Sequence, residues 1–277
     1  MGRQLSGEAR RALAAAAERF GFSATARLDA ELLLAHALGM ERGAMLLRLD
    51  DVVVPDGFAA LVERRARAEP VAYLTGSRAF WTIDLHVAPG VLVPRADTET
   101  LMEAAVAHFA GTAGPATVLD LGTGSGALLL AALDQWPRAR GVGVDRSAPA
   151  LAIAHGNARR LGMADRARFL PGEWDGDGER HDLVLCNPPY VAIDAALPDE
   201  VARHEPAGAL FAGADGLDDY RRIAPLLPGQ IALGGVACVE IGADQGESAA
   251  ALFRAVGLTV RVRQDLGGRD RCLVVTS

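Results

Sequence analysis

The amino-acid sequence predicts an α/β protein in which a mostly parallel sheet is covered by helices on both faces and preceded by a smaller helical region. Two observations lead to this fold class. Apolar strand segments alternate with helical segments from Thr117 onward, which is typical of parallel sheets. Hydrophobic residues make up 50% of the 277 residues and charged residues 23%, which is enough apolar material for a packed core.

The first part of the chain, residues 1–70, is predicted to form a small helical domain. A first helix has Ser6 as its N-cap, a second begins at Thr25 with leucines at helical spacing, and a third runs from Pro55 to Arg67. No catalytic grouping of side chains stands out in this region. We therefore expect it to serve as a docking domain for a substrate.

A linker is predicted over residues 71–96. Alternating apolar residues between Phe80 and Val87 predict two short strands, and Pro89-Gly90 supplies the turn. A helix from Asp97 to Phe109 then opens the main domain, residues 97–277.

The main domain is predicted to alternate strands with helices to its end. Ligands on such a sheet bind beyond the carboxyl ends of the strands, where the strand order reverses. The predicted strands and helices are Val118–Leu121, Leu128–Trp136, Arg140–Val144, Ala148–Leu161, Arg168–Leu170, Leu183–Cys186, Leu217–Leu227, Ile231–Ile241, Ser248–Val256, Leu258–Arg263 and Cys272–Val275.

Charge and composition exclude several classes of function. Residues 1–70 hold ten Arg and ten acidic residues, so the whole net charge of -7 lies in residues 71–277. An acidic domain follows a nucleic-acid backbone poorly, which argues against binding to long duplexes. No apolar run reaches the ~18 residues of a membrane span, and Met1–Arg11 lacks the apolar stretch of a secretory signal.

Cysteine and histidine usage argues against a metal site. The three cysteines, Cys186, Cys238 and Cys272, lie far apart, so neither a disulfide framework nor a cysteine-based zinc site is predicted. The six histidines form no pair at ligand spacing. This usage fits the reducing cytoplasm.

A glycine-rich turn follows the first strand of the main domain. Glycines let the backbone pass close under a ligand, and the start of a helix offers N–H groups to it. Asp145 ends the next strand, 145 minus 126 or 19 residues after the turn, where a carboxylate accepts the hydroxyl hydrogens of a ribose. Together these features fit nicotinamide and S-adenosylmethionine ligands alike. The candidate turn residues are Gly122, Thr123, Gly124, Ser125 and Gly126.

Two further residues are candidates for binding an adenine ring. Glu173 and Trp174 follow the third strand, beside the expected ribose site. Trp174 offers a ring for stacking, and Glu173 offers an acceptor for the adenine amino group.

The fourth strand ends in Asn187-Pro188-Pro189-Tyr190. Two prolines fix the backbone and remove two N–H donors, which leaves the Pro188 carbonyl without a regular local partner. Asn187 adds a second acceptor oxygen, and Tyr190 adds a flat ring. Two acceptors and a ring suit a planar NH2 group, so the turn is predicted to bind one.

This order of motifs resembles the class I S-adenosylmethionine-dependent methyltransferases that alkylate planar amino nitrogens, with their Rossmann-like fold. Further motifs resemble the release-factor glutamine methyltransferases (HemK/PrmC family) over essentially the whole chain. Two positions depart from the family pattern, Ala96 in place of proline and Glu173 in place of aspartate. The further motifs are Glu69–Gly76, Phe80-Trp81, Leu92–Glu99, Arg203–Pro206, Glu240–Gly242, Gln245-Gly246 and Asp265–Arg271.

The resemblance implies an activity and its partners. It implies transfer of a methyl group from S-adenosyl-L-methionine to the glutamine side-chain amide in the Gly-Gly-Gln motif of peptide-chain release factors, which leaves S-adenosyl-L-homocysteine. Asn187, Pro188 and Tyr190 are then the catalytic candidates, with Pro189 in the same substrate-binding turn. Asn187 also borders the cofactor, no metal is required, and a cytoplasmic monomer is expected.

Other functions stay open at this point. The same chemistry serves a glutamine of a ribosomal protein or an adenine amino group. A cofactor-binding module without catalysis is a third possibility, although it predicts a damaged Asn-Pro-Pro-Tyr turn. Arg95 and Glu99 either brace the cleft or touch the substrate.

Overall fold

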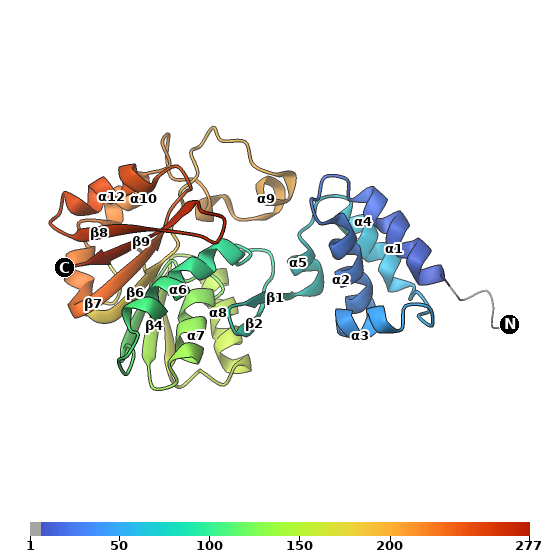
Figure 1. Ribbon diagram of the computed structural model, residues 1–277, viewed down its shortest axis with the longest axis horizontal. Coiled ribbons are helices and arrows are strands. Elements are labelled where there is room, and N and C mark those ends of the chain that lie inside the picture. Colours follow the sequence, from blue (N-terminus) through green and yellow to red (C-terminus); the bar gives the residue numbers. More distant parts are fainter. Residues whose placement is uncertain (1–6) are drawn as a thin grey trace. The chain divides into compact units, whose positions relative to one another are not determined.

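The computed structural model describes residues 7–277, and these form two compact units (Figure 1). The first unit runs to Ser77 and also contains Leu197–His204, and the second contains Arg78–Ala196 and Glu205–Ser277. Ser6, the predicted cap of the first helix, lies outside the described residues. The predicted boundaries at residues 70 and 96 divide the chain by role, and they stay predictions.

The first unit is helical. Its core is built from apolar side chains that are fully buried, such as Leu13, Phe20 and Leu33. The predicted helices are present, and the described part of the unit adds three short helices that were not predicted, at residues 42–47, 71–75 and 199–204. The helices are α1 (Glu8–Arg19), α2 (Ala26–Leu38), α3 (Arg42–Leu47), α4 (Gly57–Arg65), α5 (Val71–Thr75) and α9 (Asp199–His204).

A buried arginine organises the polar contacts of this unit. Arg65 is 3% exposed, and its Nε and Nη2 donate to Oδ2 of Asp29 at 3.0 and 2.7 Å. Its Nη1 donates to the backbone oxygen of Glu69 at 3.1 Å and to Oε2 of Glu200 at 2.8 Å. Glu200 lies on α9, so one guanidinium ties a segment from late in the chain to helices from its start.

A two-stranded sheet follows, made of β1 (Ser77–Phe80) and β2 (Ile83–His86). The turn between them is therefore Trp81-Thr82, whereas the predicted turn at Pro89-Gly90 is present but follows β2 instead of joining the two strands. Trp81 has a φ of 54°, which is unusual for a residue with a side chain. Its N–H donates to Oε1 of Glu99 at 2.9 Å, and this contact from a distant residue holds the turn in place.

The main sheet has seven strands within the described residues, in the order β5-β4-β3-β6-β7-β9-β8. Pairs among β3 to β7 are parallel, and β9 runs antiparallel to both β7 and β8. This matches the mostly parallel sheet that the sequence predicts. The strands are β3 (Thr117–Leu121), β4 (Arg140–Asp145), β5 (Ala167–Pro171), β6 (His181–Cys186), β7 (Ile231–Glu240), β8 (Thr259–Gln264) and β9 (Asp270–Thr276).

Helices cover both faces of this sheet, as predicted. Figure 1 shows α6 (Glu99–His108), α7 (Ala127–Gln135) and α8 (Ala148–Arg160) on one face, and α10 (Asp218–Ile223) with α12 (Gly246–Arg254) on the other. The helix predicted over residues 217–227 is shorter, since α10 ends at Ile223, and a separate short helix, α11 (Leu227–Gln230), follows with Pro228 in its first turn. No helix among residues 7–277 has both the length and the apolar character needed to cross a bilayer.

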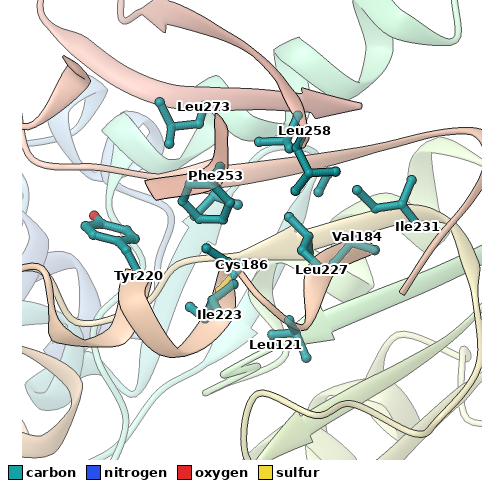
Figure 2. Close-up of a cluster of buried hydrophobic side chains, with 14 of the residues drawn as sticks. Leu121, Val184, Cys186, Tyr220, Ile223, Leu227, Ile231, Phe253, Leu258 and Leu273 are labelled. Carbon is teal, nitrogen blue, oxygen red and sulfur yellow. The ribbon is translucent and has the colours of Figure 1, made fainter. Parts of the chain in front are cut away.

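One core cluster fixes the sheet against α10, α11 and α12. Figure 2 shows Leu121, Val184 and Cys186 of the sheet together with Tyr220 and Phe253 of the helices, all of them fully buried. Burial of a large apolar side chain stabilises a fold by about 1.5–3 kcal/mol. The ends of β3 and β6, which carry the candidate site, therefore rest on a rigid support.

Candidate functional site

A cavity lies beyond the carboxyl ends of β3, β4 and β6, where the strand order reverses about β3. Leu121 pairs with Val144 on one side and with Cys186 on the other, so the residues that follow these strands meet at one edge. The cavity is lined by Gly90, Val91, Leu92, Pro94, Thr98, Asp120, Gly122, Thr123, Gly124, Ser125, Ala127, Leu128, Asp145, Arg146, Ser147, Ala150, Gly172, Glu173, Trp174, Asn187, Pro189, Pro206, Gly208, Ala209 and Arg222.

The glycine turn forms the floor of the cavity. Gly122 and Gly126 have φ of 70° and 83°, which residues with side chains rarely adopt. A Cβ on Gly122 would lie 3.3 Å from the Trp174 ring, and one on Gly126 would lie 3.1 Å from Leu130. The turn thus needs glycine for its conformation and for close packing. Gly122, Thr123, Gly124 and Ser125 line the cavity, whereas Gly126 lies behind it as the cap of α7.

Asp145 joins the glycine turn to the end of β4. Its Oδ2 accepts from the N–H of Gly124 and its Oδ1 from the N–H of Ser147, both at 2.8 Å. Ser147 caps α8, because its hydroxyl accepts from the N–H of Ala150. The Asp145 carboxylate also lines the cavity, and a carboxylate has about four acceptor positions, so it can bind ligand hydroxyls as well.

Asp120 is a cavity residue to which the sequence analysis assigned no role. Its Oδ2 accepts from the Thr123 hydroxyl at 2.6 Å and from the N–H of Leu129 at 3.2 Å. Its Oδ1 is buried and has no hydrogen-bond partner among the described residues. Burial raises the pKa of Asp120 to about 7, although the Thr123 hydroxyl acts in the opposite direction. Such an acid suits a cationic or N–H-bearing ligand group.

Glu173 and Trp174, the predicted adenine contacts, line the cavity and have protein partners of their own. The Trp174 Nε1 donates to Oδ1 of Asp219 at 2.9 Å, and the ring packs beside Gly122. Glu173 forms an ion pair with Arg222, which also lines the cavity. Their contacts with adenine stay predictions. Arg222, which no sequence motif indicated, is a further residue of this part of the cavity.

The Asn-Pro-Pro-Tyr turn lies beside the glycine turn. A Cβ on Gly122 would be 4.0 Å from the backbone oxygen of Asn187. Asn187 and Pro189 line the cavity, whereas Pro188 is buried and Tyr190 bonds to Glu240 through its hydroxyl at 3.2 Å. Burial raises the pKa of Tyr190 well above its usual range, so this hydroxyl stays protonated.

Distant loops complete the cavity. Arg95 forms an ion pair with Glu205, whose side chain is almost fully buried, and Oε2 of Glu205 accepts from the N–H of Val93 at 3.4 Å. Arg146 donates to the backbone oxygen of Gly208 at 2.7 Å. These contacts favour a bracing role for Arg95, and the bond to Trp81 favours the same for Glu99. In the sequence, this wall was marked by the motifs Leu92–Glu99 and Arg203–Pro206, but not by the pairing of Arg95 with Glu205.

Two family models match the chain. Residues 8–76 match the model described as the PrmC N-terminal domain. Residues 96–204 match the model described as the methyltransferase small domain. The first match falls on the helical unit, and the second includes the glycine turn, Asp145 and Asn187.

Curated relatives match almost the whole chain. A protein of Rhodospirillum rubrum named release factor glutamine methyltransferase is 45% identical over 90% of this chain and 78% of its own. A protein of the same name from Xylella fastidiosa is 44% identical over 95% of both chains. Among solved structures, a methyltransferase from Pyrococcus furiosus has a TM-score of 0.55 at 14% identity, and the match covers 77% of this chain and 96% of that one. This last likeness concerns the fold alone.

Proposed function

Because the chain belongs to the release factor glutamine methyltransferase family, we propose that it transfers a methyl group from S-adenosyl-L-methionine to the glutamine side-chain amide in the Gly-Gly-Gln motif of peptide-chain release factors. This makes it a protein-(glutamine-N5) methyltransferase that acts in translation termination and leaves S-adenosyl-L-homocysteine. The observation that carries the proposal is the meeting of Asn187 with the glycine turn at one cavity wall.

The cavity residues fit the cofactor. S-adenosylmethionine combines an adenosine with a cationic sulfur and an ammonium group. In this proposal Asp145 would accept from the ribose hydroxyls, and Glu173 and Trp174 would contact the adenine ring; all three line the cavity. The buried Asp120 Oδ1 has no other partner among residues 7–277, and a nearby cationic group would lower the pKa that burial raises.

The acceptor amide would be held by the Asn-Pro-Pro-Tyr turn. The Oδ1 of Asn187 and the carbonyl of Pro188 would accept its two N–H groups, while Pro189 and Tyr190 pack against its plane. An amide nitrogen is a poor nucleophile because its lone pair is delocalised into the carbonyl. Its N–H groups become more acidic as the nitrogen attacks, so these two bonds strengthen toward the transition state and lower the barrier.

The transfer balances without a metal or a strong base. When bound, the cofactor supplies a methyl carbon on a positively charged sulfur, and the C–S bond electrons stay on that sulfur. The amide nitrogen forms the new N–C bond and then loses one proton to solvent. Asn187 and Pro188 hold that proton until it leaves. Alignment of the reacting atoms at about 3–3.5 Å contributes several kcal/mol more.

The helical unit is proposed to dock the protein substrate. It carries exposed apolar side chains, among them Leu47 at 90% and Val53 at 56% exposure. Deletion of the unit would also leave Glu200 without Arg65, so surface substitutions are the sharper test. Leu47→Ser with Val53→Ser should raise the KM for a release factor several-fold and leave the cofactor Kd unchanged. An unchanged KM would contradict docking through these two side chains.

Several partner assignments complete the proposal. The protein is proposed to act in the cytoplasm as a monomer. It is also proposed not to bind long nucleic-acid duplexes, because residues 71–277 carry the whole net negative charge. A ribosomal-protein glutamine or an adenine is not favoured as the acceptor, since the curated relatives above are named for release factors.

Mass spectrometry tests the function directly. A release factor incubated with the protein and S-adenosylmethionine should gain one methyl group on the Gly-Gly-Gln loop. A ribosomal protein and a DNA duplex, incubated in parallel with labelled cofactor, should gain none. A release factor left unmethylated after prolonged incubation would refute the proposal.

A further inference from the structure

A chain of polar contacts lies behind the predicted acceptor turn and ends on Glu240, the last residue of β7. Asn187 donates through Nδ2 to the Thr98 hydroxyl, with 3.3 Å between Nδ2 and Oγ1. The Thr98 hydroxyl lies beside the Glu240 carboxylate and stabilises its charged form. The Tyr190 hydroxyl donates to Oε1 of the same carboxylate at 3.2 Å. One acid is thereby linked to both polar side chains of the turn.

The sheet register explains why these groups meet. Cys186 of β6 pairs with Val239 of β7, so Asn187 and Glu240 follow at the same level of neighbouring strands. Thr98 starts α6, which packs on β7. Thr98 is 4% exposed and lines the cavity, whereas Glu240 is 1% exposed and lies behind the wall. Glu240 therefore acts on the acceptor site only through its neighbours.

The donors and acceptors in this series of contacts fix which way the Asn187 side-chain amide is turned. An ionised carboxylate only accepts, so the Thr98 proton points to Glu240 and the oxygen lone pairs of Thr98 face Asn187. Those lone pairs can bind only the NH2 end of the Asn187 amide. The Oδ1 end then faces away from Thr98, which leaves it available to the acceptor amide.

We propose that Glu240 is a positioning residue, which acts through Thr98 to hold Asn187 with Oδ1 toward the acceptor nitrogen. The inference deepens the proposed function and rests on it. The Tyr190 hydroxyl donates to the same carboxylate, so Glu240 also holds the ring of Tyr190 in position.

The arrangement depends on the charge of Glu240. Burial raises the pKa of Glu240 to about 7, although Thr98 and the Arg271 guanidinium oppose this shift. A protonated Glu240 has a donor of its own, which frees the Thr98 proton to bind Oδ1 of Asn187 and reverses the amide. We therefore expect kcat to fall as the pH drops below about 7. The charged and titratable groups that face Glu240 are Asp97, Arg271, Tyr190, Tyr220, Cys186 and Cys272.

Two isosteric substitutions test the link. Glu240→Gln places a donor beside Thr98, and Thr98→Val removes the hydroxyl. Each should lower kcat for a release factor about 10- to 100-fold, with KM within about threefold and the cofactor Kd within about twofold of wild type. Thr98→Ser should return kcat to within about threefold. Thr100→Val, the same change at another buried threonine, is the matched control and should leave kcat unchanged.

The outcomes separate this inference from the proposed function. Wild-type kcat in Thr98→Val overturns the inference, and so does a Thr98→Ser variant as slow as Thr98→Val. A loss of kcat below pH 7 that persists unchanged in Glu240→Gln overturns the role of its charge. Thermal unfolding checks each fold, and the Thr98 pair decides if Glu240→Gln does not fold. A wild-type protein that methylates no release factor refutes the proposed function instead.

Discussion

The carboxylate of Asp145 accepts a hydrogen bond from the backbone N–H of Gly124, with 2.8 Å between Oδ2 and the nitrogen. The contact joins the end of β4 to the turn after β3. One side chain thus shapes the floor of the cavity and also faces the place of the proposed ribose.

Asp145→Ala should weaken cofactor binding about 10- to 100-fold, because it removes the ribose acceptor and releases the N–H of Gly124. Isothermal titration calorimetry with S-adenosylmethionine measures the Kd. Asp165→Ala, at an exposed aspartate outside the cavity, is the control and should leave the Kd unchanged. A wild-type Kd for Asp145→Ala would remove the ribose assignment.

Asn187→Ala should lower kcat by ~10²-fold or more, the size of one lost transition-state hydrogen bond, while the cofactor Kd stays within a few-fold. Single-turnover methylation of a release factor measures the chemical step, and calorimetry measures binding. Normal turnover in this variant would refute the role of Oδ1.

The stability of the protein should depend on pH through Glu240. Its folded pKa of about 7 lies above the usual 4.5, so the native state binds this proton more tightly than the unfolded state does. The resulting stabilisation is present below pH 4.5 and is lost as the pH rises to about 7. Relative to Glu240→Gln, the wild-type free energy of unfolding should fall by up to about 3 kcal/mol over this range. Urea denaturation measures both free energies of unfolding, and the same pH dependence in wild type and Glu240→Gln would contradict this prediction.

Asn157 is fully buried and pins three elements together. Its side chain accepts from the N–H of His86 and donates to the backbone oxygens of His86 and Ser125, at 2.8, 3.0 and 2.9 Å. Asn157→Leu should cost about 2–4 kcal/mol in chemical denaturation, because buried backbone groups lose their partners. Gly156→Ala, at an open position of the same helix, should be neutral or slightly stabilising. An equal change in the free energy of unfolding for the two variants would contradict the proposed role of the Asn157 hydrogen bonds.

Arg65→Met should destabilise the helical unit by about 3–5 kcal/mol, because Asp29 would keep a buried charge without its partner. Chemical denaturation measures the loss. Arg10→Met breaks the exposed pair with Asp50 and should cost much less than Arg65→Met, because solvent screens this pair. The cofactor Kd should stay unchanged in both variants, and a similar cost for both would show that burial does not govern the effect.

Local sequence signals were enough to predict most of the fold. Strands with uninterrupted apolar runs and helices of two turns or more, such as α8, were predicted within a few residues of their observed ends. The short helices α3, α5 and α9 were missed because five or six residues are too few to show a helical period. The turn at Trp81-Thr82 was missed because it depends on Glu99, whereas Pro89-Gly90 carried the stronger local signal.

Part of the candidate site was likewise predictable from local sequence signals, and part was not. The glycine turn, Asp145 and Asn187 follow strand ends, so the order of strands predicts that they meet. The links from Thr98 to Asn187 and from Arg95 to Glu205 join residues about 90 and 110 positions apart. Neither link has a local pattern, and only the three-dimensional register brings these residues together.

The salt bridge between Arg65 and Glu200 has a consequence for biosynthesis. A ribosome releases the first 77 residues long before it adds α9, so the emerging helices wait for roughly 120 further residues before their last partner exists. Until then, Arg65 can bond to Asp29 and to the backbone oxygen of Glu69, and only its bond to Glu200 is missing. Nascent chains arrested before and after position 204 should therefore differ in protease resistance within the same early segment.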